Sequence, residues 1–340
     1  MPPLWVVLPE AEGLDTRLPP PAGRIERCSC GGVCDRNEGE DRESGRSAQY
    51  IWKDCQECGQ EALSGGGGRG GSEGRGLSVM GDGTLTKLMG WFKDKGGVVV
   101  AFSGGLDSTL VAAVAKRALG KRAIAVTVKT EFISKREGEE AASVARSLGI
   151  RHRVVDLQLP DSVRNNPPDR CYICKKHIMG SLKRLACEIG FDTVVDGTNY
   201  DDLGSDRPGL SALQEERIKS PLAELKIGKA QIRELSKALG LDYTKPANPC
   251  LATRFPSGHR ITGDDVETVA AAEDFIRKMG FRVVRVRVYD RSAKIEVRRE
   301  NIPEILKGKR LERITSELKR LGFENVTLDP DGYRTDSMDR

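Results

Sequence analysis

Apolar positions between about residue 83 and residue 200 follow an alternation of strand-like and helix-like patterns. The run Val98–Phe102 is continuously apolar and short, which predicts a strand that is buried on both faces. The other expected strands are 123–128, 151–157 and 193–196, and the expected helices are 106–119, 136–148 and 172–189. Strands that alternate with helices of this length predict an α/β fold with a doubly wound parallel sheet.

The pattern changes after about residue 262. A helix at 264–279 is followed by a hairpin of two strands, and a helix at 311–321 and a strand at 326–328 complete the unit. This order predicts a smaller C-terminal α+β domain. We therefore expect a main domain at 80–260, a small domain at 261–330 and a polar tail at 331–340.

Residues 1–79 keep neither a helical nor a strand period. The segment holds Pro19–Pro21 and the glycine-rich run Gly65–Gly76, and such a composition buries too little apolar surface to offset the entropy of ordering. Cys55 and Cys58 have the spacing of a zinc knuckle, but the other cysteines upstream complete no common finger. We interpret residues 1–79 as a disordered extension or as a segment wrongly included upstream of the folded chain.

Composition narrows the function classes. No apolar run in the 340 residues approaches the ~20 residues of a membrane helix, and the N-terminus lacks a signal-peptide pattern. We therefore expect a cytoplasmic protein with no membrane partner. The net charge of +5 permits anionic ligands without arguing for nucleic acid, and nine Cys against three His favour thiol chemistry over a His-rich metal site.

The sequence S-G-G-L-D-S at 103–108 lies between a predicted strand and a predicted helix. Its glycines let backbone N–H groups approach an anion, and the helix N-terminus adds positive potential. Asp107 would repel a phosphate unless a divalent cation lies between them, so it implies Mg²⁺. The loop lacks the Gly-Lys-Ser/Thr ending of a Walker loop, and its spacing alone fits a glycine turn with a helix cap equally well. The residues of the motif expected to contact such an anion and its cation are Ser103, Gly104, Gly105, Asp107 and Ser108.

S-G-G-x-D-S after a first buried strand resembles the PP-loop ATP pyrophosphatase superfamily, whose loop holds the pyrophosphate that leaves when AMP is joined to a substrate. Further segments narrow the resemblance to the LarE family, the ATP-dependent sulfur transferases of nickel-pincer nucleotide synthesis. These segments are 166–176, 196–202, 207–209, 220–222, 229–233, 245–254, 285–287 and 293–297. The resemblance runs from about residue 83 to residue 329.

The resemblance implies a reaction and a small-molecule substrate. A carboxylate of pyridinium-3,5-dicarboxylate mononucleotide is adenylated by ATP with Mg²⁺, and sulfur then displaces AMP to give a thiocarboxylate. The resemblance also implies substrate or phosphate binding by Lys175, Arg254, Arg285 and Arg287. In the strand 283–288, Arg285 and Arg287 share a face, which suits phosphate binding but is also typical of a solvated strand face. Asp201 and Asp202 fit a cation site, a pair that orients the substrate, or a turn cap. We also expect a homo-oligomer.

The cysteines bear on the sulfur source. Cys250 falls where some LarE proteins carry a single sacrificial cysteine that gives up its own sulfur. Cys171-x-x-Cys174, taken alone, is typical of a zinc pair or a redox dithiol. Together with Cys250 it suits a 4Fe–4S cluster with one open iron that holds hydrosulfide. We therefore expect Cys171, Cys174 and Cys250 to ligate a cluster, and Cys250 and Asp107 to be catalytic.

Two alternatives compete with this interpretation. A tRNA thiolase of the same superfamily would also combine a PP-loop with three cluster-binding cysteines. It would need an RNA-binding surface, yet residues 1–79 carry more acidic than basic residues. A non-enzymatic nucleotide or metal sensor would not need the intact motif at 103–108.

Overall fold

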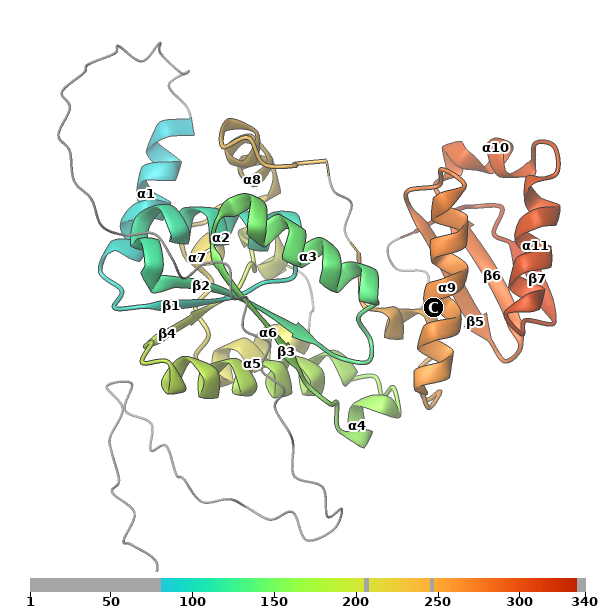
Figure 1. Cartoon of the computed structure of the whole chain (residues 1–340), viewed down its shortest axis with the longest axis horizontal. Coiled ribbons are helices and arrows are strands. Elements are labelled where there is room, and N and C mark those ends of the chain that lie inside the picture. The colour runs from blue at the N-terminus through green and yellow to red at the C-terminus, as the bar shows by residue number, and fades with distance from the viewer. Residues whose placement is uncertain (1–80, 205–207, 245–247, 335–340) are drawn as a thin grey trace, which may run out of the picture. The chain divides into compact units, whose positions relative to one another are not determined.

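The computed structural model describes residues 81–204, 208–244 and 248–334 (Figure 1). The extension at 1–79 with Cys55 and Cys58, parts of two segments that support the family resemblance, and most of the polar tail lie outside the described residues. Within those ranges, no helix combines the length and the apolar character that crossing a bilayer requires.

The first sheet contains four parallel strands in the order β3-β2-β1-β4. They are β1 (Val98–Ala101), β2 (Ala123–Lys129), β3 (Arg151–Asp156) and β4 (Thr193–Val195). Along the chain, β2 pairs with one edge of β1 and β3 pairs with β2, and β4 then pairs with the opposite edge of β1. The strand order therefore reverses between β1 and β4, and in open α/β sheets ligands bind at the carboxyl ends of the strands beside such a point.

Helices cover both faces of this sheet, which confirms the doubly wound prediction (Figure 1). One layer contains α1 (Gly81–Lys93), α2 (Leu106–Leu119), α3 (Lys135–Leu148), α7 (Pro221–Glu224) and α8 (Lys229–Ala238). The other contains α5 (Arg170–Glu188) and α6 (Pro208–Glu215). Alternate residues of β1 enter the two layers: Val98 and Val100 pack into the first and Val99 into the second. The strands read as continuous apolar runs because both of their faces are buried.

The second sheet has three strands in the order β5-β6-β7. They are β5 (Val284–Tyr289), β6 (Ser292–Val297) and β7 (Asn325–Leu328), and the accompanying helices are α9 (Gly263–Lys278), α10 (Ile302–Leu306) and α11 (Arg310–Arg320). β5 and β6 form the predicted antiparallel hairpin, and β7 runs parallel to β6. Its apolar core also takes in Phe132, Leu159 and Val163. The domain boundary at 260/261 stays a prediction.

Short elements complete the described chain. They are α4 (Asp161–Arg164) and the 3-10 turns η2 (Gly120–Arg122), η3 (Tyr200–Gly204), η4 (Leu251–Arg254) and η5 (Arg299–Asn301). Two of them position functional side chains. η3 follows β4 at the carboxyl edge of the first sheet, and η4 begins directly after Cys250.

β5 departs from the alternation of a half-buried strand. Val284, Val286 and Val288 face the core as expected, but Arg285 and Arg287 are only 3% and 4% exposed. The arginine face is therefore not a solvated one. The burial of Arg287 is tolerated because Glu296 of β6 accepts a hydrogen bond from its Nε at 3.1 Å.

Candidate active site

The motif at 103–108 forms the turn between β1 and α2, as predicted. Gly104 has φ 68°, and a Cβ there would lie 2.8 Å from Ala141 Cα in α3, so both the backbone and the packing require glycine. Ser103 Oγ lies 3.1 Å from Ser108 Oγ and accepts a hydrogen bond from Gly105 N at 3.3 Å. No side chain caps α2, which removes the interpretation of the motif as an Asp-Ser helix cap.

Asp107 lies at the centre of a charged cluster. Asn199 Nδ2, from the loop after β4, donates to Asp107 Oδ2 at 3.2 Å. Burial raises the pKa of Asp107, and the charge of Asp202 adds to this, while the Asn199 hydrogen bond and the charges of Lys229 and Arg233 act in the opposite sense. The carboxylates of Asp107 and Asp202 suit a divalent cation, and the basic side chains of Lys229 and Arg233 suit an anion bound beside it. Lys229 and Arg233 belong to a segment that supported the resemblance, yet the sequence alone assigned them no role.

The adjacent acids Asp201 and Asp202 make different contacts. Asp201 accepts a hydrogen bond from Lys229 N at 2.7 Å and so caps the start of α8. A Cβ on Gly228 would lie 2.8 Å from Asp201 Oδ1, so a larger residue there would displace this cap. Asp202 is 7% exposed, pairs with Lys229 Nζ at 3.5 Å and acts electrostatically on Asp107. Asp201 therefore matches the turn-cap interpretation. Asp202 also accepts a hydrogen bond from Asn199 N at 3.3 Å, and a cation role for Asp202 stays a prediction.

Lys175 is tied to the end of β4. Its Nζ lies 3.3 Å from Asp196 Oδ2. Asp196 is 3% exposed and also accepts hydrogen bonds from Thr198 Oγ1 at 2.6 Å and Ser220 Oγ at 2.7 Å. This network fixes the first turns of α5 against the sheet edge that carries the PP-loop.

The structure brings the three predicted cysteines together. Cys171 and Cys174 lie one turn apart at the start of α5, and all three thiols are free. Burial raises the pKa of Cys174 to about 12, and the nearby charges of Cys250 and Cys171 contribute in the same direction. Within the described ranges, no three or more His, Cys, Asp or Glu side chains are arranged around a metal-sized site. The sulfurs therefore share one neighbourhood without forming a closed set of metal ligands.

Cys250 is anchored to the carboxyl end of β2. Leu251 N donates to Phe132 O at 3.0 Å, and Phe132 follows β2 closely. Asn248 Nδ2 donates to Glu137, the residue that completes the capping box of α3. The segment 248–251, here called the thiol loop, is thus held at the carboxyl end of β2 and at the N-terminus of α3. β2 pairs with β1, the strand that leads into the PP-loop.

Arg254 is buried beside this loop. The side chain is 0% exposed, and Nε and Nη2 donate to the two oxygens of Glu273 at 2.7 and 3.1 Å. Its Nη1 donates to Pro249 O at 3.0 Å and to Cys250 O at 3.2 Å. In this structure Arg254 holds the Cys250 backbone and does not face solvent.

The two arginines of β5 are placed similarly. Arg287 Nη1 donates to Thr253 O at 2.6 Å. Arg285 Nη1 donates to Val284 O at 2.8 Å, and its guanidinium lies over the Tyr333 ring at 5.1 Å. Burial lowers the pKa of Arg285 to about 10, assisted by the charge of Arg254. These contacts shape the loop after Cys250, and a phosphate-binding role for the arginines stays a proposal.

Sequence reasoning missed Arg170. Its Nη2 lies 3.9 Å from Cys171 Sγ, and its charge also acts on Cys174 and Cys250. The only pattern that could have drawn attention to it is its position directly before Cys171-x-x-Cys174.

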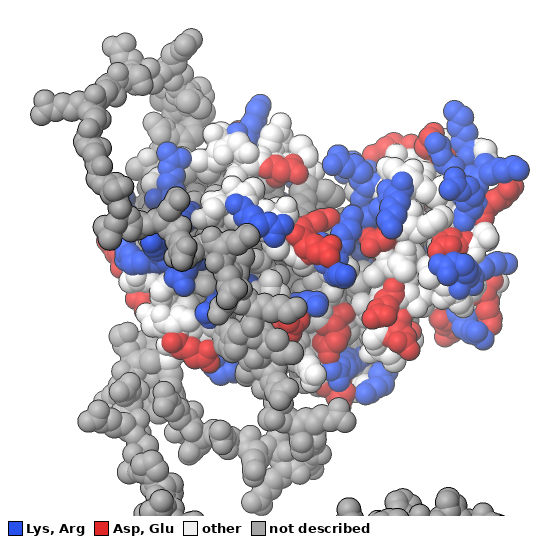
Figure 2. Space-filling model, viewed as in Figure 1, with Lys and Arg blue, Asp and Glu red and all other residues white. Residues whose placement is uncertain are grey.

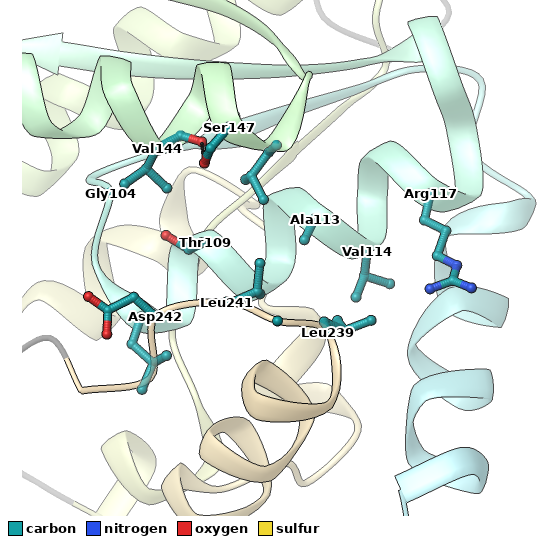
Figure 3. Close-up of a pocket in the computed structure, with 13 residues that line it drawn as sticks. Gly104, Thr109, Ala113, Val114, Arg117, Val144, Ser147, Leu239, Leu241 and Asp242 are labelled. Atoms are coloured by element: carbon teal, nitrogen blue, oxygen red, sulfur yellow. Dashed lines mark hydrogen bonds between the residues drawn. The ribbon is translucent and has the colours of Figure 1, made fainter. Parts of the chain in front are cut away.

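A separate cavity of ≈ 430 Å³ lies between α2, α3 and the segment Leu239–Asp242 (Figure 3). Gly104 and Leu106 contribute to its wall, but the side chains that bear the predicted chemistry, including Asp107 and Cys250, do not line it. Where Figure 2 shows described residues, basic and acidic side chains are interspersed.

A parallel sheet with S-G-G-L-D-S at the reversal of strand order defines a PP-loop enzyme that uses ATP. A family model described as NAD synthase matches residues 92–171. An uncharacterized protein of Synechocystis is 39% identical over 75% of this chain and 97% of its own length. The pyridinium-3,5-bisthiocarboxylic acid mononucleotide synthase of Lactiplantibacillus plantarum is 37% identical over 74% and 92%. An uncharacterized protein of Methanocaldococcus jannaschii is 35% identical over 72% and 93%. The chain belongs to the LarE family, as that synthase does.

Proposed function

We propose that the chain adenylates a carboxylate of pyridinium-3,5-dicarboxylate mononucleotide and then replaces AMP with sulfur. One observation carries this proposal. The backbone bond from Leu251 N to Phe132 O holds Cys250 at the end of β2, and the PP-loop follows the neighbouring strand β1. An ATP-activating loop and a group of thiols thus lie at the same edge of one sheet. The name of the Lactiplantibacillus relative supports the choice of substrate.

The adenylation half of the site is the charged cluster around the PP-loop. Ser103, Ser108 and the backbone of Gly104 and Gly105 would bind the phosphates of ATP. Asp107 and Asp202 would hold Mg²⁺, which offsets phosphate charge when bound. Lys229 and Arg233 lie close enough to Asp107 to act on it electrostatically, and their charges suit the pyrophosphate that leaves.

The substrate half combines Lys175 with the buried arginines near the thiol loop. Arginine forks suit a phosphate dianion, and Arg254, Arg285 and Arg287 come from η4 and β5, next to Cys250 in the fold. We propose that the nucleotide phosphate of the substrate binds toward Arg285 and Arg287. Arg254 would then support this region through its bond to the Cys250 carbonyl.

The sulfur source that we propose is a 4Fe–4S cluster held by Cys171, Cys174 and Cys250. The donor set suits it chemically, because all three cysteines are free and cysteine sulfur is the ligand that holds such clusters. Bound there, such a cluster would supply the sulfur atom that replaces AMP. The residues of the chain would position the acyl group beside it. We also propose a homo-oligomer in the cytoplasm, a compartment that supplies ATP and keeps thiols reduced.

The decisive experiment is anaerobic reconstitution followed by reaction with ATP and the dicarboxylate mononucleotide. We expect AMP, pyrophosphate and a thiocarboxylate product by mass spectrometry, with an oxygen-sensitive brown protein. The contrary outcome is an iron-free protein that transfers sulfur once and whose Cys250 becomes lighter by the mass of hydrogen sulfide. Cys250 would then be a sacrificial sulfur donor, and no cluster would be involved. If ATP turnover depended on co-purified tRNA, the substrate would be tRNA and not the mononucleotide.

A further inference from the structure

Arg170 is a half-buried cation that faces the three thiols. It is the first residue of α5, and its Nη2 lies 3.9 Å from Cys171 Sγ. Its charge also acts on Cys174 and on Cys250, although Cys250 lies 80 residues further along the chain. The guanidinium therefore lies beside Cys171 Sγ and close enough to Cys174 and Cys250 to act on them electrostatically.

Asn166 fixes this orientation. Asn166 is 0% exposed and has φ 52°, a left-handed conformation that Asn tolerates better than most residues. Its Nδ2 donates to Phe255 O at 3.3 Å and to Pro256 O at 2.7 Å. Because both carbonyl oxygens accept hydrogen bonds from Nδ2, the orientation of the amide is fixed. Its Oδ1 then accepts a hydrogen bond from Arg170 Nη1. One arm of the fork is thereby held by a buried neutral group.

The guanidinium has no acidic partner among the residues that the structure describes. Its polar contacts there are Asn166 Oδ1 and Cys171 Sγ. Other half-buried or buried arginines of the site region do hold carboxylates: Arg164 binds Glu131, and Arg254 binds Glu273. A partly desolvated cation without a counter-ion costs free energy unless a ligand supplies the negative charge. Arg170 therefore has the surroundings of an anion-binding group.

We propose that Arg170 binds the reacting carboxylate of the substrate beside the thiols, a role that rests on the proposed function. With Nη1 held by Asn166, the free donors of the fork offer one edge, which suits a planar carboxylate. The place also fits the chemistry. When sulfur adds to the acyl carbon, negative charge develops on the acyl oxygen next to the sulfur, where a fixed cation stabilises it.

The test compares two ligands on the full chain by isothermal titration calorimetry. The first is pyridinium-3,5-dicarboxylate mononucleotide, and the second is nicotinamide mononucleotide, whose ring carries one amide and no carboxylate. Arg170→Gln should weaken binding of the dicarboxylate about ten- to hundredfold and leave the affinity for nicotinamide mononucleotide unchanged. Arg170→Lys should recover part of the loss, because it restores the charge without the fork.

Arg184→Gln is the matched control, since it removes the same charge from the exposed face of the same helix. It should leave both affinities unchanged. The subsite is refuted if Arg170→Gln binds the dicarboxylate as the parent does, or if it weakens both ligands equally, which would indicate a structural role. A parent protein that does not bind the dicarboxylate at all would instead overturn the proposed function, and the subsite with it.

Discussion

Arg254 and Glu273 form a doubly hydrogen-bonded ion pair in which both side chains are fully buried. Arg254 Nε and Nη2 donate to Glu273 Oε1 and Oε2 at 2.7 and 3.1 Å. Glu273 Oε1 also accepts from Val286 N at 3.1 Å, and Arg254 Nη1 reaches Cys250 O at 3.2 Å. One carboxylate of α9 thus connects strand β5 to the loop that carries the thiol.

Replacing Glu273 by Gln should destabilise the protein by about 3–5 kcal/mol, because the Arg254 charge would stay buried without its partner. Although burial alone would raise it, Arg254 and Arg277 hold the pKa of Glu273 below its usual range. The pair therefore contributes stability above the unfolded pKa, and that contribution is lost as pH falls through the lower folded value. Urea unfolding measures the change. Glu267→Gln on the exposed face of α9 should shift stability by less than about 0.5 kcal/mol, and equal effects of the two substitutions would contradict the prediction.

Asp107→Asn should reduce AMP formation by at least about a hundredfold while the fold persists, because the substitution removes a cation ligand at the PP-loop. The measurement is pyrophosphate release together with circular dichroism. Asp94→Asn, at an exposed position after α1, is the control and should retain parental turnover. Parental rates in Asp107→Asn would show that this carboxylate is not part of the chemistry.

The parallel sheet was predictable because strands that are buried on both faces are continuous runs of apolar residues in the sequence. β2 (Ala123–Lys129) extends the predicted strand by one residue, and the predicted bounds of α2 match the structure. The short helices α4 and α7 were not predicted, since four residues are too few to show a helical period. In these segments, tertiary contacts decide the local structure.

The site was predictable only where its residues lie close together in sequence. The motif at 103–108 and Cys171-x-x-Cys174 are local patterns, and both lie where the sequence indicated. A strand period showed that Arg285 and Arg287 share a face, but it could not show that Glu296 and the Thr253 carbonyl cover that face. The role of Arg170 depends on Cys250, 80 residues away, so no local pattern revealed it.

His152 should make stability depend on pH below neutrality. Thr127 Oγ1 donates to Phe102 O at 2.8 Å, so it accepts from His152 Nε2 at 2.9 Å, and the ring therefore carries a hydrogen on Nε2. Burial lowers the pKa of His152 to about 4 from 6.5. Because the pKa of His152 is lower in the folded state than in the unfolded state, the free energy of unfolding is highest above pH 6.5. It decreases as the pH falls from 6.5 toward 4.

His152→Gln should flatten this part of the profile by on the order of 1–2 kcal/mol between pH 7 and pH 4.5, a range reduced for the partial exposure of the ring. Urea unfolding at several pH values, with parent and variant compared at each, isolates the contribution of His152 from that of the carboxylates. His177→Gln, on α5, is the control and should keep the parental profile. Identical profiles for the parent and His152→Gln would contradict the lowered pKa of His152.

Single replacements of Cys171, Cys174 or Cys250 by Ala should each lower iron content after anaerobic reconstitution from about four irons per chain, since each removes one of three ligands. ATP-dependent pyrophosphate release should persist, because Asp107 and the PP-loop are untouched. Iron and sulfide analysis beside the absorption near ~400 nm usual for such clusters measures the loss. Lys183→Ala, exposed on α5, should retain full iron content. If Cys171→Ala and Cys174→Ala transfer sulfur as the parent does while only Cys250→Ala fails, Cys250 is the sole donor and the cluster is absent from the reaction.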